Sequence, residues 1–388
     1  MTQNSRELRL LVCFRLARSF TAGMIAIVFP YYVLADFHYG ASTLGLLYAS
    51  ATIATAGLAL LFGYWADLRS RRATLLIAGA LVPVSALLAF SSGRLPFLFA
   101  AAMLGGFSAT GSRASGSVGG AAQPIQSAVI ADLTTVGNRT SFFSLFTFLS
   151  GLCGAAGMLM AKAFSTRGAF LAGALISGFG LLFVLAMKLP EPRPQPRRLR
   201  SLKVIGKFSV TGAVNGISQG LIMPFLIPFF VIVYHVPRQS MAVYGFGGEL
   251  LSSVAILVSP LIERRLGFVK GIAITRGAGA LLLLLLPLTR NFPLAIFVYL
   301  VTPALRVVAV PAQQTALTAM VHDDETGRAL GVNQVARLTA SSGAVACTGY
   351  LFDISEIGAP FYAYAAVVGF SLILYFRFFG SRPTLRPR

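Results

Sequence analysis

A single acidic side chain, Glu249, stands deep inside a long apolar stretch of the sequence. An ionisable residue in such a place is costly, which makes it a functional candidate by default. Burial favours the protonated form of a carboxyl group, so Glu249 is a candidate site for taking up and releasing a proton. The alternative is a fixed ion pair between Glu249 and an arginine of the C-terminal half of the chain.

Arginines outnumber this acid inside the apolar stretches. A guanidinium fork suits carboxylate or phosphate groups, so the excess indicates a buried pocket for anionic groups. The alternative is that several of these arginines pair structurally or extend to the membrane surface, as we expect for Arg276 and allow for Arg15. The residues concerned are Arg15, Arg18, Arg113, Arg276, Arg306 and Arg337.

A polar string that follows the second apolar stretch contains Gly63, Asp67, Arg71 and Arg72. Asp67 lies one helical turn after Gly63 on the same helix face. Gly63 allows a neighbouring helix to approach, and the Asp67 carboxylate can face that helix's positive N-terminal end while holding Arg71 or Arg72. A cluster that forms in one conformation and breaks in another is a conformational latch. The alternative is a solvated basic loop.

Two further charges stand where the fourth apolar stretch ends. Asp132 is expected to pair with the latch arginines or with Arg139, and the alternative is an exposed charge at a helix end. We include Asp132 and Arg139 in the predicted latch.

Enzymatic chemistry is poorly supported by the rest of the sequence. Its histidines, His38, His235 and His322, are far apart at the edges of apolar stretches. None of its cysteines has metal-ligand spacing, and there is no phosphate-cradling Gly-Lys-Ser/Thr loop. We therefore predict no catalytic residues, no metal and no cofactor.

The elements that carry these residues must be membrane helices. Of the 388 residues, 56% are hydrophobic and 11% are charged, and the mean hydropathy is +0.77. A soluble protein would carry roughly 25% charged residues. A backbone surrounded by lipid must satisfy its hydrogen bonds internally, as helices and closed β-barrels do. The long continuous apolar runs favour helices over a barrel. The predicted spans are about 9–34, 42–66, 73–91, 95–133, 141–163, 168–188, 207–234, 240–262, 269–288, 293–320, 328–352 and 357–380.

Basic residues fix the predicted orientation. We predict a protein of the cell's inner (cytoplasmic) membrane with both termini in the cytoplasm. In this orientation most lysines and arginines fall in cytoplasmic loops. The exceptions outside the spans are Arg94, Lys162, Arg167, Arg238 and Arg290. This arrangement at anionic lipid headgroups accounts for the net charge of +20, and no nucleic-acid partner is expected.

The chain divides at a proline- and arginine-rich stretch over 189–206, giving two six-helix halves, 1–188 and 207–388. The halves resemble each other, because Pro124-Ile-Gln126 near the end of the fourth span recurs as Pro311-Ala-Gln313 in the tenth. The fourth span would be about 58 Å long as one helix, too long for an apolar layer of about 30 Å. We expect a break at Gly111–Gly120, and the alternative is a protruding loop.

Gly63, Asp67, Arg71 and Arg72 resemble the loop signature of the major facilitator superfamily, and the two predicted halves are similar to its two bundles. The resemblance implies an all-α membrane protein whose twelve transmembrane helices form two pseudo-symmetric six-helix bundles (the MFS fold). It also implies a small-molecule transporter working by alternating access, in which helices 1, 4, 7 and 10 line the cavity. Arg18, Arg113 and Arg306 are then the predicted substrate-binding residues.

The end of the fourth span, Pro124 to Asp132 followed by Arg139, looks like that of the superfamily's drug–proton antiporters. This resemblance favours proton-coupled efflux of small organic or amphipathic molecules, with Glu249 as the coupling residue and a monomer as the working unit. The alternative is an organic-anion importer or exchanger built on Arg18 and Arg306.

Overall fold

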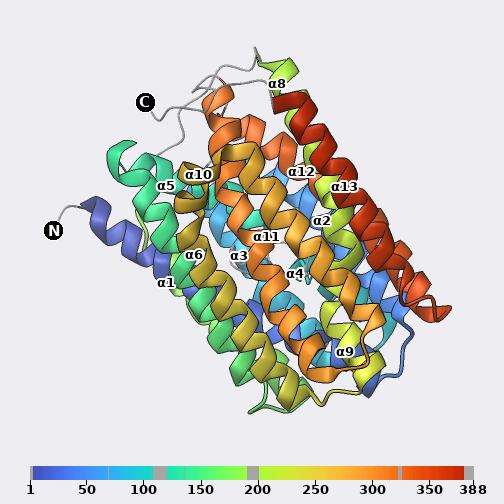
Figure 1. Cartoon of the computed structure of the whole chain (residues 1–388). Coiled ribbons are helices and arrows are strands. Elements are labelled where there is room, and N and C mark those ends of the chain that lie inside the picture. Colours follow the sequence, from blue (N-terminus) through green and yellow to red (C-terminus); the bar gives the residue numbers. More distant parts are fainter. Residues whose placement is uncertain are drawn as a thin grey trace.

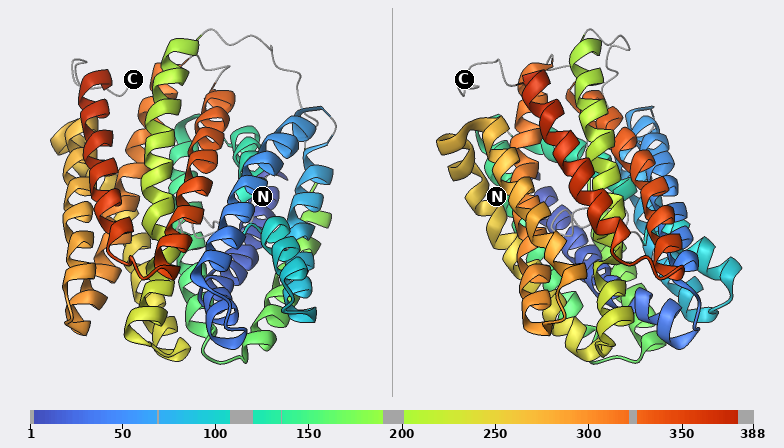
Figure 2. Two further views of the ribbon diagram at one scale, coloured as in Figure 1. Left: turned by 90° about the vertical axis from the view of Figure 1, so that its right-hand side faces the viewer. Right: turned by 45° about the vertical axis from the view of Figure 1, so that its right-hand side comes forward.

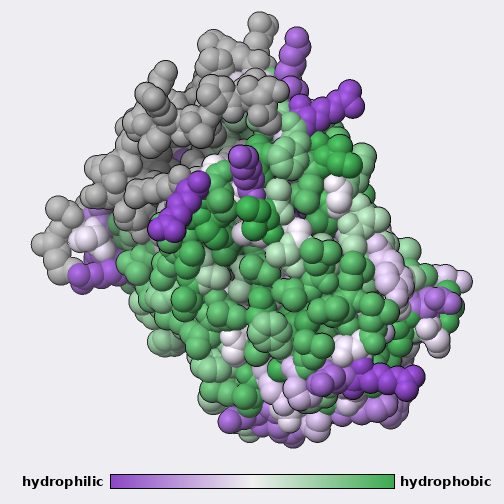
Figure 3. Space-filling view, viewed as in Figure 1, coloured by the Kyte–Doolittle hydropathy of each residue, from purple (hydrophilic) through white to green (hydrophobic). Residues whose placement is uncertain are grey.

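A computed structural model describes residues 3–68, 70–107, 120–134, 136–189, 201–321 and 326–379. These residues form helices and no strands, and the helices run side by side (Figure 1). Ten helical segments of this described part are long and apolar enough to cross a membrane. The surface is hydrophobic through the middle and carries hydrophilic side chains toward both ends (Figure 3). The predicted all-α membrane fold is confirmed.

The N-terminal half forms one bundle, drawn in blue to green in Figure 2. Its fourth span is divided, because α4 ends before Gly106, a left-handed residue with φ of 60°, and α5 begins only after a short 3-10 turn. Most of the break predicted at Gly111–Gly120 lies outside the described residues. The helices are α1 (Gln3–Tyr31, continued by a π-turn over Tyr32–Asp36), α2 (Ala41–Leu68), α3 (Arg71–Ser91), α4 (Leu95–Gly105), α5 (Gln123–Leu133), α6 (Val136–Met160) and α7 (Thr166–Leu185).

The C-terminal half forms a second bundle beside the first, drawn in yellow-green to red (Figure 2). The long α10 holds two spans that meet at Gly267, whose φ of 73° turns the chain back. The first helix of this bundle, α8, begins within the stretch predicted as a linker. Most of that stretch lies outside the described residues. The helices are α8 (Leu202–Ile222), α9 (Leu226–Tyr234), α10 (Arg238–Leu288), α11 (Phe292–Met320), α12 (Thr326–Asp353) and α13 (Ala359–Phe379).

Glycines let equivalent helices cross at close range in both bundles. In the first bundle, a Cβ added to Gly23 of α1 would stand 1.9 Å from the Gly154 carbonyl oxygen of α6. In the second, a Cβ on Gly216 of α8 would stand 2.0 Å from the Arg337 carbonyl oxygen of α12. Small residues at such crossings replace the apolar driving force that lipid cannot supply. The first and fifth spans of each half therefore pack in the same way.

The outer helices present large apolar side chains to the surroundings. Leu175 and Phe179 of α7, Leu281 of α10 and Phe370 of α13 are each more than half exposed. In lipid this exposure costs nothing, because hydrocarbon is as apolar as the side chains. Polar groups are consequently concentrated between the helices, where the candidate site lies.

Candidate functional site

The two ends of the helix bundles differ, and each is named here by what it carries. The motif end holds Arg71 and Arg72 at the start of α3. The distal end is the opposite one, where α2 begins and α12 finishes.

At the distal end, α12 closes on the start of α2. The Asp353 carboxylate accepts hydrogen bonds from the backbone N–H groups of Ala41 (2.6 Å) and Ser42 (2.9 Å). These groups are the unsatisfied donors at a helix N-terminus, where the macrodipole also favours a negative charge. Asp353 therefore acts as an N-terminal cap donated by the opposite bundle.

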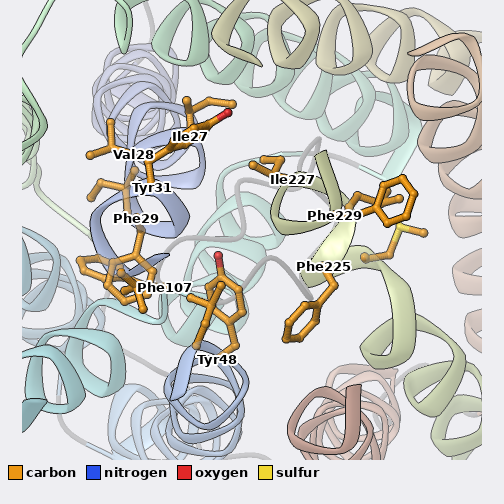
Figure 4. Packing of buried hydrophobic residues seen from close by; sticks show 14 of the residues in the cluster. Ile27, Val28, Phe29, Tyr31, Tyr48, Phe107, Phe225, Ile227 and Phe229 are labelled. Carbon is orange, nitrogen blue, oxygen red and sulfur yellow. The ribbon is translucent and has the colours of Figure 1, made fainter. Parts of the chain in front are cut away.

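Close packing continues inward from this cap. A Cβ on Gly45 of α2 would stand 2.9 Å from the Gly349 Cα of α12. Further in, the Tyr48 ring of α2 meets the Phe225 ring of the other bundle at 6.4 Å between centroids (Figure 4). The Tyr31 hydroxyl at the end of α1 also donates to the Val236 carbonyl (2.6 Å). The two bundles are thus joined at the distal end.

Toward the motif end the two bundles part. A Cβ on Gly57 or Gly63 of α2, or on Gly331 of α12, would meet no described atom within 4 Å. The buried apolar residues follow the same division: one cluster spans both bundles in the distal half, whereas separate clusters around Leu75 and Tyr375 fill each bundle at the motif end. The described core residues therefore join the two bundles at the distal end, and no described core cluster joins them at the motif end.

We expect Asp353→Ala to weaken distal closure. Loss of a capping carboxylate costs about 1 kcal/mol, which shifts an equilibrium roughly fivefold. Thiol labelling of a cysteine introduced at Tyr48, inside the closed end, should therefore speed up by about that factor from the distal side. Glu356→Ala, an exposed acid one turn beyond, is the control. Equal labelling rates in the two variants would remove Asp353 from the closing contact.

The motif residues form a compact cluster. Arg71 of α3 pairs with Asp132 of α5 and is itself buried, and Arg72 donates to the Leu185 carbonyl of α7. The side chains of Asp67 and Arg139 lie outside the described residues. Gly63 was expected to admit a neighbouring helix, and a Cβ added there would meet no described atom within 4 Å. The ion pair ties α3 to α5 within the first bundle.

Glu249 lies in the interface between the bundles. It is 1% exposed, and its Oε1 would stand 3.8 Å from a Cβ on Gly154 of α6. The Ser19 carbonyl oxygen of α1 lies 3.6 Å from the same point. The carboxyl group therefore lies close to α6 and α1 of the first bundle.

Two buried arginines bind glutamines that the repeated Pro-x-Gln motif supplies. Arg15 donates to Gln126 Oε1 (2.8 Å) and Ser150 Oγ (3.1 Å), so it does not extend to the membrane surface. Arg276 donates to Gln313 Oε1 (2.9 Å) and is 4% exposed. The expectation that Arg276 extends to the membrane surface was wrong, because α11 and α13 cover its guanidinium group and supply polar and aromatic partners.

The predicted substrate arginines lie in different bundles. Arg18 is 3% exposed and lies 5.4 Å above the Phe14 ring. Arg306 is half-buried and donates to Asn215 Oδ1 of α8 (3.0 Å). Arg113 lies outside the described residues. Sequence reasoning missed Asn215 and Asp353, since neither stands in a motif and each matters only through a helix distant in sequence.

Known proteins share this arrangement of two bundles. Residues 11–345 match the family model described as Major Facilitator Superfamily. The chain belongs to the Major Facilitator Superfamily. It is therefore a multi-pass membrane protein and a secondary transporter of small molecules, and this membership points to a transporter rather than an enzyme.

Solved structures of this superfamily are similar along nearly their whole length. The xylose transporter XylE from E. coli, in a partially occluded inward-open conformation, has a TM-score of 0.76 and 14% identity, with 100% of each chain covered. A D-xylose-proton symporter has a TM-score of 0.77 and 15% identity, with 97% of this chain and 98% of that chain covered. The human organic anion transporter MFSD10 has a TM-score of 0.70 and 13% identity, with 96% and 100% covered. No curated protein matches the sequence. At these identities the likeness shows the fold alone.

Proposed function

We propose that this superfamily member exports small organic or amphipathic molecules by proton antiport, with Glu249 as the proton-binding residue. The observation that carries the proposal is the burial of Glu249 between the bundles, facing α6 and close to α1. A carboxyl group in that interface changes its surroundings whenever the bundles move. Its proton affinity then changes with the conformation, which is what coupling requires.

The proposed orientation places the motif end and both termini in the cytoplasm, with the protein in a cell's inner membrane. Basic residues near the described helix ends support it, among them Arg71 and Arg72 at α3 and Lys203 and Lys207 at α8. In this orientation the structure opens inward, as an exporter must do to load its cargo. We expect the monomer to be the working unit.

A transport assay tests the coupling. Purified protein is reconstituted into liposomes with ethidium as the amphipathic probe, and a pH gradient is imposed. Proton antiport predicts gradient-driven ethidium movement together with a counterflow of protons, seen with an internal pH dye. An ethidium transport rate that does not depend on the pH gradient would contradict the proposal.

The second candidate is an organic-anion importer or exchanger. Buried Arg18 and half-buried Arg306 favour it, because they stand on the first and tenth spans, which the family arrangement places around the central path. The same liposomes loaded with p-aminohippurate separate the two. Exchange of internal against external p-aminohippurate without proton movement would favour this candidate.

We expect Asp67→Asn to slow turnover several-fold while probe affinity stays within about twofold. Asp67 belongs to the latch in this proposal, so its charge sets the rate of switching between states and not the binding energy of the substrate. Initial rates measured over a range of ethidium concentrations give both quantities. The matched control is Asp36→Asn, at an exposed distal turn. A large loss of affinity would instead place Asp67 in the binding site.

A further inference from the structure

Three arginines of the C-terminal bundle converge from three helices. Arg276 belongs to the second span of α10, Arg306 to α11 and Arg337 to α12. Arg306 and Arg337 lie against the same turn of α8, because Arg306 donates to Asn215 and a Cβ on Gly216 would stand 2.0 Å from the Arg337 carbonyl oxygen. The positive charge of Arg276 acts on both. This arginine cluster lies within membrane spans, where like charges repel strongly because the medium screens them poorly.

The partners of the arginine cluster in the described residues are neutral. Arg276 donates to the Gln313 amide oxygen and lies 5.5 Å above the Tyr375 ring. Arg306 donates to the Asn215 side chain and backbone. None of the three arginines has an ion pair with a described acid. Several positive charges therefore share one region without a described counter-charge, which is costly unless an anion joins them.

The arginine cluster retains donors for such an anion. The Nε and Nη1 atoms of Arg276 are buried and make no hydrogen bond to any described group. Arg306 and Arg337 are only half-buried, so the cluster is accessible on their side. A guanidinium fork matches the oxygen pairs of carboxylate and phosphate. The cluster therefore combines a buried guanidinium group at Arg276 with two accessible guanidinium groups at Arg306 and Arg337.

We infer that the arginine cluster is an anion-binding subsite that holds the carboxylate or phosphate group of the transported molecule. This inference rests on the proposed transport function and adds organic anions to the molecules that the transporter carries. Asn215 and Gln313 are positioning residues in this account, because each accepts hydrogen bonds that orient one guanidinium group.

Direct binding tests the inference without any transport. The full chain is placed in nanodiscs of neutral phosphatidylcholine, and equilibrium binding of radiolabelled p-aminohippurate is measured. We expect saturable binding that phenyl phosphate displaces and that the neutral amide benzamide does not. Arg306→Gln and Arg337→Gln should each weaken binding by about tenfold or more, and the lysine variants should retain part of it.

Controls distinguish a soluble organic anion from a lipid headgroup as the bound ligand. Arg290→Gln, at an exposed distal turn, should bind as wild type does. A second set of nanodiscs contains phosphatidylglycerol. If this lipid occupies the arginine cluster there and neither soluble anion binds in either set, the ligand is a lipid headgroup and the inference is overturned. Absent saturable binding in wild type, or equal binding in the well-folded glutamine variants, would also overturn it. Because binding needs no proton gradient, a failure of proton coupling leaves this result unaffected.

Discussion

Glu249→Gln should abolish pH-driven transport, reducing the gradient-dependent rate to that of liposomes without protein. Glutamine keeps the size and hydrogen-bonding capacity of the protonated acid but cannot release a proton. The variant can still switch between its conformations, since a neutral side chain between α10 and α6 has a much smaller desolvation cost than a charge. Energy coupling is therefore lost while binding and passive exchange persist.

Ethidium flux with and without a pH gradient measures this outcome. The gradient-driven component should vanish in Glu249→Gln, whereas exchange across a membrane at equal pH should continue. Glu356→Gln, on an exposed turn, serves as the control for loss of a carboxylate. An unchanged pH-driven rate would remove Glu249 from the coupling mechanism.

Gly23→Ala should destabilise the first bundle more than any surface change. The added methyl would stand 1.9 Å from the Gly154 carbonyl oxygen, and backbone atoms on both sides cannot rotate away. The α1–α6 crossing must widen, at a cost of about 1–3 kcal/mol. Because Glu249 packs against the same part of α6, widening also displaces the coupling residue.

The thermal midpoint of the purified protein measures this effect, and Gly57→Ala is the matched control. Gly57 is also a helical glycine, but a Cβ there meets no described atom within 4 Å. Alanine is the better helix former by about 1 kcal/mol, so the control should unfold at the same temperature or higher. Equal midpoints for the two variants would mean that the crossing is not as close as described.

The fold was predictable because lipid imposes simple rules. Long apolar runs must be helices, and the repeat of Pro124-Ile-Gln126 as Pro311-Ala-Gln313 indicated two similar halves. The motif predicted a charged cluster, and in the structure Asp132 lies against Arg71. These signals are local in sequence, which is why the sequence alone could supply them.

The side-chain contacts between different spans were not predictable in the same way. Asp353 caps α2 from the opposite bundle, and Glu249 lies close to α6 of the other bundle. Arg276 looked close enough to a helix end to reach the surface, yet Gln313 holds it inside. Each of these contacts depends on how helices rotate against each other, and hydropathy does not encode that rotation.

The central claim is that the bundles alternate, opening one end as the other closes. Distances between spin labels test it in a chain whose native cysteines are replaced by serine. One pair of labels replaces Leu46 and Tyr350, exposed beside the distal contact, and the other replaces Tyr64 and Val332, exposed toward the motif end.

The resting protein should give a short distal distance and a long motif-end distance. Asp353→Ala and acidic buffer should each add a population in which the distal pair lengthens and the motif-end pair shortens together. If the two distances lengthen together or shorten together, alternating access in this protein is contradicted. A motif-end distance that never changes would contradict it as well.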